Sequence, residues 1–179
     1  MATMSYHFTP PQPPAVDARA RIAVFGAAGA TGQHAVRHAL AAGHRVSAFL
    51  ADPTHLPLSH EALRLVHADP LVPQSLQGVL DGHDAVLCLV GHKPESLQHD
   101  AVPSHRPPLA ALATRHLVAA MSEAGVQRMV LLGAAGVGNS VVAGPLGLGR
   151  WLQRLMPEVM ADKERQEALV RGSAVNNDG

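Results

Sequence analysis

The chain has little cysteine, few aromatic residues and no excess of either charge. Its single cysteine, Cys88, excludes an intrachain disulfide and fits a reducing compartment. The 14 basic and 14 acidic residues balance, so the sequence indicates no general attraction to nucleic acid or to an anionic membrane surface. Aromatic residues make up only 3% of the chain, which argues against recognition of nucleic-acid bases by stacking.

Long apolar segments are also lacking. No apolar run approaches the ~20 residues that a membrane-spanning helix needs, and the N-terminus has no basic region followed by an apolar core, as a signal peptide would. We therefore predict a cytoplasmic protein without a membrane partner. Four prolines between positions 10 and 14 predict a flexible tail over residues 1–18. A single domain is expected over residues 19–173, followed by a polar tail over residues 174–179.

The most informative segment is a glycine motif between a strand pattern and a helix pattern. An apolar run at residues 22–25 is followed by Gly26, Gly29 and Gly32, and apolar residues then recur at helical spacing as far as Gly43. Glycines let the backbone turn sharply and approach a pyrophosphate closely, and the start of a helix attracts its negative charge. The order of strand, glycine loop and helix therefore predicts a dinucleotide-binding site.

Apolar, β-prone runs alternate with helical patterns along the rest of the domain. Strands are predicted at residues 22–25, 44–50, 63–66, 84–90 and 127–132. Helices are predicted from the glycine loop to Gly43 and at residues 73–80, 109–124 and 151–171, the last with a break at Pro157. A short turn or helix is expected to open at Asp52, and residues 133–149 are too rich in glycine for a regular element.

This alternation predicts an α/β fold of the Rossmann type. Its doubly wound parallel sheet should have strand order 3-2-1-4-5, with helices on both faces. A ligand crevice is expected at the carboxyl ends of the first and fourth strands, where the strand order reverses.

Over about residues 21–173, the sequence resembles the atypical short-chain dehydrogenase/reductases, particularly the NmrA-like and NAD(P)H-binding branch that includes biliverdin/flavin reductases. The likeness rests on an ordered series of motifs, among them V-F-G-A-A-G-A-T-G (24–32), A-L-A-A-G-H-R-V-S-A-F (39–49), A-G-V-Q-R-M-V-L-L (124–132) and D-K-E-R-Q-E-A-L-V-R-G-S (162–173). It implies an oxidoreductase-type domain that binds NADP or NAD and transfers hydride from NAD(P)H to a small electrophilic acceptor. The alternative is a non-catalytic NAD(P)-sensing regulator of the NmrA-like type.

The resemblance also implies which residues bind the cofactor. It assigns the pyrophosphate to the glycine loop, whose residues are Gly26, Ala28, Gly29, Ala30, Thr31 and Gly32. It places Asp69 near the adenine, and Leu89, Val90 and Gly91 on the nicotinamide-ribose side. Lys163 could bind a ribose hydroxyl. Simpler alternatives are that Asp69 caps a loop before Pro70, and that Lys163 is a solvated helix lysine beside Glu164 and Glu167.

The residues after the second strand bear on the choice between NADP and NAD. Many NADP-using relatives have an arginine just before the Asp-Pro pair, where this chain has Ala51. Asp52 lies at a spacing that suits a ribose 2′-hydroxyl, but it is also a good cap for a short helix, and we favour the cap. Arg45 and His55 are candidate substitutes for the missing arginine.

The catalytic residues of the wider superfamily are absent. The Tyr-x-x-x-Lys motif is broken because Val159 occupies the tyrosine position, and Tyr6, the only tyrosine, lies in the tail. Gly133 and Ala134 replace the serines expected after the fifth strand. A Ser-Tyr-Lys mechanism is therefore excluded, and the catalytic residues are unknown.

Three further expectations concern histidines, Cys88 and the end of the sheet. His34 and His38 lie four residues apart on the polar face of a helix, but no third ligand is indicated, so no metal site is predicted. His92, just after Gly91, could donate a proton, and Cys88 should be a buried structural thiol. Relatives continue beyond the last helix, so the chain looks C-terminally short, and the edge of the fifth strand could be capped by a second subunit.

Overall fold

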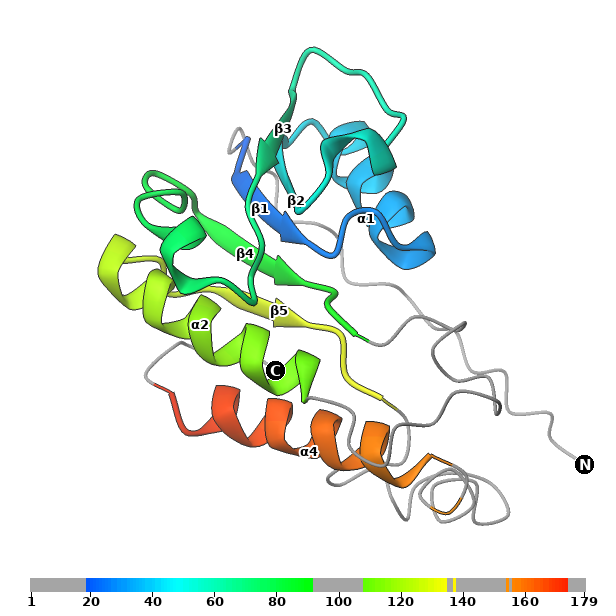
Figure 1. Ribbon diagram of the computed structural model, residues 1–179. Helices are drawn as coiled ribbons and strands as arrows, with labels where there is room; N and C mark the ends of the chain where they lie inside the picture. The colour runs from blue at the N-terminus through cyan, green and yellow to red at the C-terminus, as the bar shows by residue number, and fades with distance from the viewer. Residues whose placement is uncertain (1–18, 92–107, 135–136, 138–153, 155, 174–179) are drawn as a thin grey trace, which may run out of the picture.

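Five parallel strands form the centre of the protein, and helices cover both faces of the sheet (Figure 1). The computed structural model describes residues 19–91, 108–134, 137, 154 and 156–173. The strands are β1 (Arg21–Phe25), β2 (Arg45–Leu50), β3 (Leu63–His67), β4 (Ala85–Cys88) and β5 (Met129–Leu131). The α-helices are α1 (Ala30–Ala41), α2 (Leu109–Ala124) and α4 (Pro157–Arg171). Two 3-10 turns, η1 (Pro53–His55) and η2 (Pro73–Leu76), lie in the connections.

The sheet has the order β3-β2-β1-β4-β5, and all four strand pairs are parallel. This confirms the predicted Rossmann-type topology. The chain runs outward from β1 to β3, then returns to the other side of β1 as β4. The strand order therefore reverses between β1 and β4, and the carboxyl ends of these two strands mark the position where the ligand crevice is expected.

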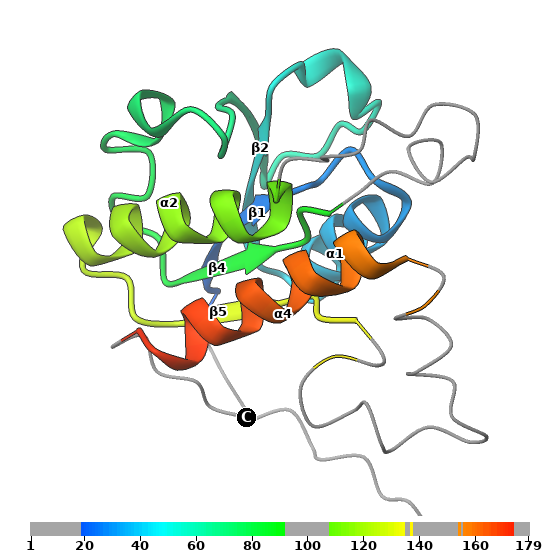
Figure 2. The ribbon, with the colours of Figure 1, turned by 60° about the horizontal axis from the view of Figure 1, so that its bottom comes forward.

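Both faces of the central strands are buried, because α1 covers one face of the sheet and α2 with α4 cover the other (Figures 1 and 2). On the α1 side, Val24 of β1 packs in one apolar cluster with Val36. On the other side, Phe25 packs with Leu117 of α2 and stacks on Phe49 of β2 with ring centroids 4.6 Å apart. A strand buried on both faces needs a continuous apolar run, which is why the β1 sequence lacks polar alternation.

Some predicted elements are shorter than the sequence indicated. The helix predicted at residues 73–80 is wrong beyond Leu76, because only the 3-10 turn η2 forms there. Gly78 and Gly82 follow with φ values of +67° and +71°, which are left-handed conformations that end a helix. The alternation of strand and α-helix is therefore incomplete, since η1 and η2 replace α-helices in two connections. Strands β4 and β5 are also shorter than predicted at both ends.

Several predictions lie wholly or largely outside the described residues. They concern the tails at residues 1–18 and 174–179, the loop at residues 133–149, and the residues before Pro157. Pro157 is the first residue of α4, where a missing N–H costs nothing, as expected for the predicted break. In the described ranges, no helix is both long and apolar enough to cross a membrane.

Candidate functional site

The glycine loop joins the end of β1 to the start of α1. Gly26 has a φ of +84°, in the left-handed region that residues with a side chain rarely adopt. A Cβ at this position would lie 2.7 Å from both the carbonyl carbon and the carbonyl oxygen of Leu89. Gly26 therefore serves the turn and also lets the loop lie directly against the chain that leaves β4.

The other two glycines of the loop differ in what surrounds them. A Cβ at Gly32 would lie 2.1 Å from the carbonyl oxygen of Gly26, so α1 can pack on the loop only with glycine there. A Cβ at Gly29 would meet only the same oxygen at 3.5 Å, which is an ordinary contact, and Gly29 is exposed. The protein's own packing thus explains the glycines at 26 and 32, but it leaves open space at Gly29.

The N-terminus of α1 begins beside Gly29, and within the described part of the chain the N–H groups of Ala30 and Thr31 have no hydrogen-bond partner. The first N–H groups of a helix have no partner within the helix, and no side chain caps α1 at Gly29. No acidic residue lies in its first turn, and Ala30 and Thr31 are exposed. The carbonyl of Ala28 is already used, since it accepts a 3.2 Å hydrogen bond from Nε2 of Gln33. The free N–H groups and the helix dipole together favour an anion at this position.

The segment after β4 lies beside the glycine loop, at the same edge of the sheet. The N–H of Leu89 donates a 2.9 Å hydrogen bond to the carbonyl of Phe25, which continues the β1–β4 ladder up to the loop. Leu89 and Val90 are half-buried, while Gly91 is exposed. A Cβ at Gly91 would come no closer than 3.6 Å to Nζ of Lys163, so the fold itself does not require glycine there.

Lys163 of α4 is buried, with only 8% of its surface exposed, so its interpretation as a solvated helix lysine is wrong. Its Nζ donates to the carbonyl oxygens of Val90 at 3.2 Å and Leu132 at 3.0 Å, and to Oε1 of Gln166 at 2.8 Å. An ammonium has three donors, so all of them are used. Burial lowers the pKa of Lys163 below its ordinary value. A ribose contact therefore stays a prediction that requires one of these bonds to be released.

A buried polar network continues from Lys163 into the core. Gln166 is fully buried, and its Nε2 donates a 2.9 Å hydrogen bond to Oγ1 of Thr114 on α2. Cys88 lies next to both, with its Sγ 3.9 Å from Nε2 of Gln166 and 3.9 Å from Oγ1 of Thr114. The prediction of a buried thiol is confirmed, and burial raises its pKa. A raised pKa keeps the thiol protonated, which makes it a poor nucleophile.

Asp162, adjacent to Lys163, is 2% exposed and caps α2 from another helix. Its two carboxylate oxygens accept hydrogen bonds of 2.9 Å from the N–H groups of Ala110 and Ala111. This role of Asp162 was not predicted from the sequence, nor were those of Gln166 and Thr114. The available signal was the spacing of these side chains, because Gln166 lies four residues after Asp162 and three after Lys163, and such positions are neighbours on a helix.

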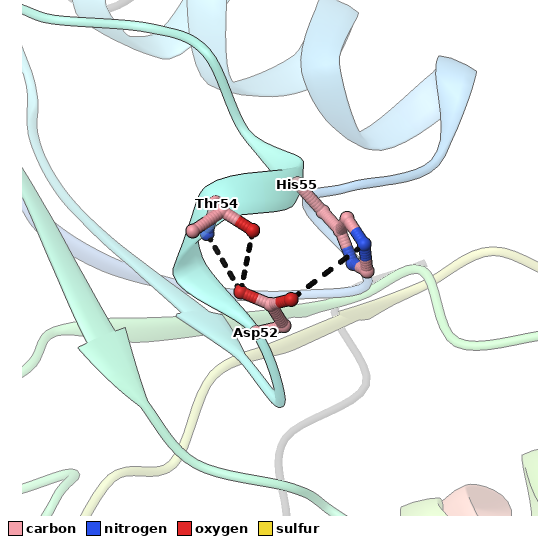
Figure 3. A network of polar contacts seen from close by, with 3 residues as sticks. All are labelled: Asp52, Thr54 and His55. Atoms are coloured by element: carbon pink, nitrogen blue, oxygen red, sulfur yellow. Dashed lines mark hydrogen bonds and ion pairs between the residues drawn. The ribbon is translucent and has the colours of Figure 1, made fainter.

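Asp52 caps η1, as favoured from the sequence (Figure 3). Its Oδ1 accepts from the backbone N–H of Thr54 at 2.9 Å and from its hydroxyl at 2.7 Å, while Oδ2 lies 3.7 Å from Nε2 of His55. The hydrogen bonds from the side chain and the backbone of Thr54 lower the pKa of Asp52. Ala51 beside it is exposed.

Arg45 is wrongly placed to substitute for the missing arginine. It begins β2 and pairs with Arg21 at the start of β1, so it lies at the amino ends of the strands, whereas the glycine loop lies at their carboxyl ends. His55 follows the end of β2 and stays a candidate, with its imidazole directed toward Asp52 (Figure 3).

Asp69 closes the turn that follows β3. Its Oδ1 accepts a 2.9 Å hydrogen bond from the N–H of Leu71, and its own backbone is bound twice by the hydroxyl of Ser75. This is the capping role weighed from the sequence. Asp69 is half-buried and follows the carboxyl end of β3, on the side of the sheet where the glycine loop lies. Its position is compatible with the adenine contact, which stays a prediction.

The remaining residues considered from the sequence are two histidines of α1 and two residues that are not described. His34 and His38 are exposed on α1, and within the described ranges no three potential ligands cluster as a metal site would need. Tyr6 and His92 lie outside the described residues.

Several solved structures share this fold at low sequence identity. The oxidoreductase YlbE from Lactococcus lactis is 18% identical with a TM-score of 0.65, covering 85% of this chain and 63% of its own. A short-chain dehydrogenase/reductase from Veillonella parvula in complex with NADP is 19% identical with a TM-score of 0.63, covering 88% and 66%. The enzyme WbmH from Bordetella bronchiseptica in complex with NAD⁺ is 16% identical with a TM-score of 0.62, covering 89% and 54%. The chain thus spans less than two thirds of the length of these proteins.

The sequence profile of the family described as NAD(P)H-binding matches residues 26–176. The match begins at Gly26, the first glycine of the loop, and extends through α4 and its buried polar residues. The match covers most of the chain, and the strand order and the open glycine loop agree with it. The chain therefore belongs to the NAD(P)H-binding family.

Proposed function

We propose that the protein binds NADPH or NADH at the glycine loop and transfers hydride from it to a small electrophilic acceptor. The observation that carries the proposal is the room at Gly29, where a Cβ would meet, among the described residues other than its two chain neighbours, no atom closer than 3.5 Å. A glycine that the fold does not need is explained by close approach of a pyrophosphate to the backbone. The uncapped N-terminus of α1, free of acidic residues, supports the same assignment.

The remaining cofactor contacts would come from the segments that follow β3 and β4, which lie at the carboxyl ends of the strands with the glycine loop. The N–H groups of Ala30 and Thr31 would hold the pyrophosphate, and Leu89 to Gly91 would line the nicotinamide-ribose side. Asp69 would accept from the adenine amine. The packing of Gly26 against Leu89 supports this arrangement, because it joins the two loops at one edge of the sheet.

The chemistry of the reaction belongs to the cofactor, which supplies a hydride from its nicotinamide when it is bound. The chain supplies orientation, because Val159 and Gly133 stand where relatives carry the catalytic tyrosine and serine. Lys163 has its three donors bound to Val90, Leu132 and Gln166. The proton for the reduced acceptor would therefore come from solvent or from a loop group.

We expect little discrimination between NADP and NAD. Ala51 is exposed and offers no charge to a 2′-phosphate, while both oxygens of Asp52 face partners within η1. Neither the usual guanidinium for NADP nor a free carboxylate for a ribose 2′-hydroxyl is thus present at this position.

The second candidate is a non-catalytic sensor of the dinucleotide. The favouring observation is that Lys163 holds the ends of β4 and β5 together and has no free donor for chemistry. A sensor would use the same glycine loop and would bind a partner according to cofactor state. A second subunit at the sheet edge beside β5, where Val130 is 55% exposed, is one such partner.

Calorimetric titration with NADPH and NADH, followed by an assay with quinones, flavins and aldehydes, tests these proposals. The native protein should bind both cofactors, and folded Gly29→Val should not, because valine fills the space of the pyrophosphate. Unchanged affinity in folded Gly29→Val would remove the glycine-loop assignment. Cofactor oxidation that depends on an acceptor supports the enzyme, whereas binding without turnover on the whole panel supports the sensor.

A further inference from the structure

A second group of polar side chains lies at the amino ends of the strands, whereas the glycine loop lies at their carboxyl ends. A cavity of about 770 Å³ is formed there by the first residues of β1, β2 and β3 and by the loops before and between them. Its charged lining comprises four arginines, Arg19, Arg21, Arg45 and Arg64, against two acids, Glu61 and Asp81. Three histidines, His44, His60 and His83, also line it. The cavity therefore carries an excess of positive charge in a chain whose overall charge is balanced.

Strand register places three of these arginines on one face of the sheet. Arg21 pairs with Arg45, and Ser47 pairs with Arg64, across neighbouring parallel strands. In-register neighbours share a face, as do residues two apart on one strand. Arg21, Arg45 and Arg64 therefore project from the same face of three adjacent strands, which are about 4.8 Å apart.

All three arginines are exposed, so water screens the repulsion between their like charges in part. Arg21 and Arg45 stand side by side with like charge, which is unfavourable. Among the described residues, no ion pair forms with the guanidinium groups of these three arginines, and only the backbone N–H of Arg21 binds an acid, Asp84. An anion in the cavity would remove the repulsion.

The guanidinium of Arg21 lies against the backbone of Gly82 in the cavity wall. A Cβ at Gly82 would lie 2.9 Å from Nη1 of Arg21 and 3.3 Å from its Cζ and Nη2, so the guanidinium rests on the bare backbone of Gly82. The planar fork of a guanidinium matches the oxygens of a phosphate.

Two unsatisfied histidine atoms belong to the same cavity. Nδ1 of His44 and Nδ1 of His83 are buried without a hydrogen-bond partner, and in the described part of the chain no other buried side-chain nitrogen or oxygen lacks one. His83 is held by a 2.9 Å contact from Nε2 to the hydroxyl of Ser47. Unpaired buried polar atoms are costly, and both line the cavity with the unpaired arginines.

We propose that this cavity is a second anion site, which binds a small molecule that carries a diphosphate or a longer phosphate chain. Three neighbouring arginines on one face of the sheet match an anion with several charged groups better than a single carboxylate. The site is separate from the glycine loop, because β1 begins at Arg21 in the cavity and ends at Phe25 beside the loop, about 13 Å away at ~3.3 Å per residue.

Calorimetric titration with pyrophosphate tests the proposal. Gly29→Val serves as the background, so that binding at the glycine loop does not contribute. Adding Arg45→Gln or Arg21→Gln should weaken pyrophosphate binding by about tenfold or more, because each removes charged hydrogen bonds. Adding Arg37→Gln, an exposed arginine of α1 outside the cavity, should change nothing. Equal loss in all three variants, or no binding below ~1 mM in the background protein, overturns the proposal.

A thermal readout on the protein without Gly29→Val covers a background variant that does not fold. Pyrophosphate should raise the melting temperature of the native protein and of Arg37→Gln, but much less that of Arg45→Gln. Without ligand, Arg45→Gln should melt no lower than native, because it relieves the repulsion from Arg21. Equal stabilisation of all three proteins by pyrophosphate would contradict the proposal.

Three probes define the ligand. Pyrophosphate and a nucleoside diphosphate of equal affinity indicate that the phosphate chain alone is recognised, and tighter binding of the nucleotide indicates further contacts to the nucleoside. Both results support the site. Citrate that binds as tightly as pyrophosphate would overturn the assignment to phosphate.

Discussion

Nζ of Lys163 donates a 3.0 Å hydrogen bond to the carbonyl of Leu132, just after β5 ends. The same nitrogen binds the carbonyl of Val90, just after β4 ends. One side chain of α4 thus joins the carboxyl ends of two neighbouring strands, on the side of the sheet where the glycine loop lies. The family resemblance implies that Lys163 contacts a ribose, but in this structure its ammonium group bridges the ends of β4 and β5 by hydrogen bonds.

Replacing this lysine should destabilise the protein. Lys163→Met keeps most of the side-chain volume but leaves Val90, Leu132 and Gln166 without their donor. We expect a loss of about 1–3 kcal/mol in the free energy of unfolding, measured by urea denaturation, since buried acceptors lose their partners. Arg165→Met, at an exposed position on the same helix, is the matched control and should change little. A Lys163→Met protein as stable as that control would show that the three bonds contribute nothing net.

The same residue should make stability depend on pH in the alkaline range. Burial lowers the pKa of Lys163 below 10.5 in the folded protein. Between the lowered pKa and 10.5 the unfolded chain binds more protons, so the contribution of Lys163 to stability rises with pH in that window. The stability difference between native and Lys163→Met should therefore shift in favour of native as pH rises from neutral toward 10.5. A difference that stays constant over this range would count against a buried ammonium.

Asp162 should contribute to stability through α2 rather than through its own helix. Asp162→Ala leaves the N–H groups of Ala110 and Ala111 unpaired in a buried place. The expected loss is about 1–2 kcal/mol, the usual range for removal of a helix cap. Glu164→Ala, an exposed neighbour on α4, should lie within about 0.5 kcal/mol of native. Equal effects of the two substitutions in urea denaturation would show that the cap is not important.

Local patterns predicted much of the fold. The strand, glycines and helix at residues 21–43 are contiguous, so spacing alone located the loop, and the run of strand patterns gave the strand order. The helix predicted at residues 73–80 failed because apolar spacing there did not reveal that Gly78 and Gly82 adopt left-handed conformations. Apolar period cannot distinguish one 3-10 turn from a short α-helix.

The buried polar contacts could not be read from the sequence. Asp162 meets Ala110 and Gln166 meets Thr114, each across 52 positions of chain. Only the packing of α4 on α2 brings these groups together. The grouping of Arg21, Arg45 and Arg64 on one face likewise depends on strand register. A shift of one residue would turn the side chains of one strand to the other face. Residues that act through such distant pairing look like ordinary surface charges in the sequence.

Cofactor choice should respond to position 51. Ala51 is exposed, so arginine fits there without disturbing the core, and its guanidinium suits a 2′-phosphate. We expect Ala51→Arg to tighten NADPH binding about tenfold or more while NADH binding stays nearly unchanged, as calorimetry would show. Ala51→Gln, of similar length without charge, is the control. If the native protein already prefers NADPH by more than about a hundredfold, ~2.7 kcal/mol, another cation reads the phosphate and our interpretation of Ala51 is wrong.

Turnover should be slow even where the cofactor binds tightly. Fast reduction needs a proton donor aimed at the acceptor and a pocket that excludes water. Val159 and Gly133 supply no hydroxyl at the positions where the family resemblance implies one, and Lys163 has its three donors bound to protein acceptors. We therefore expect kcat/KM well below ~10⁴ M⁻¹s⁻¹, the lower end of the ordinary enzyme range, for quinones, flavins and aldehydes in steady-state assays with NADPH.

Lys163→Met should lower kcat/KM little further in protein that remains folded, since the ammonium binds the ends of two strands rather than substrate. A value near ~10⁵ M⁻¹s⁻¹ on any acceptor, lost on Lys163→Met but not on Arg165→Met, would show instead that Lys163 releases a bond and takes part in the reaction.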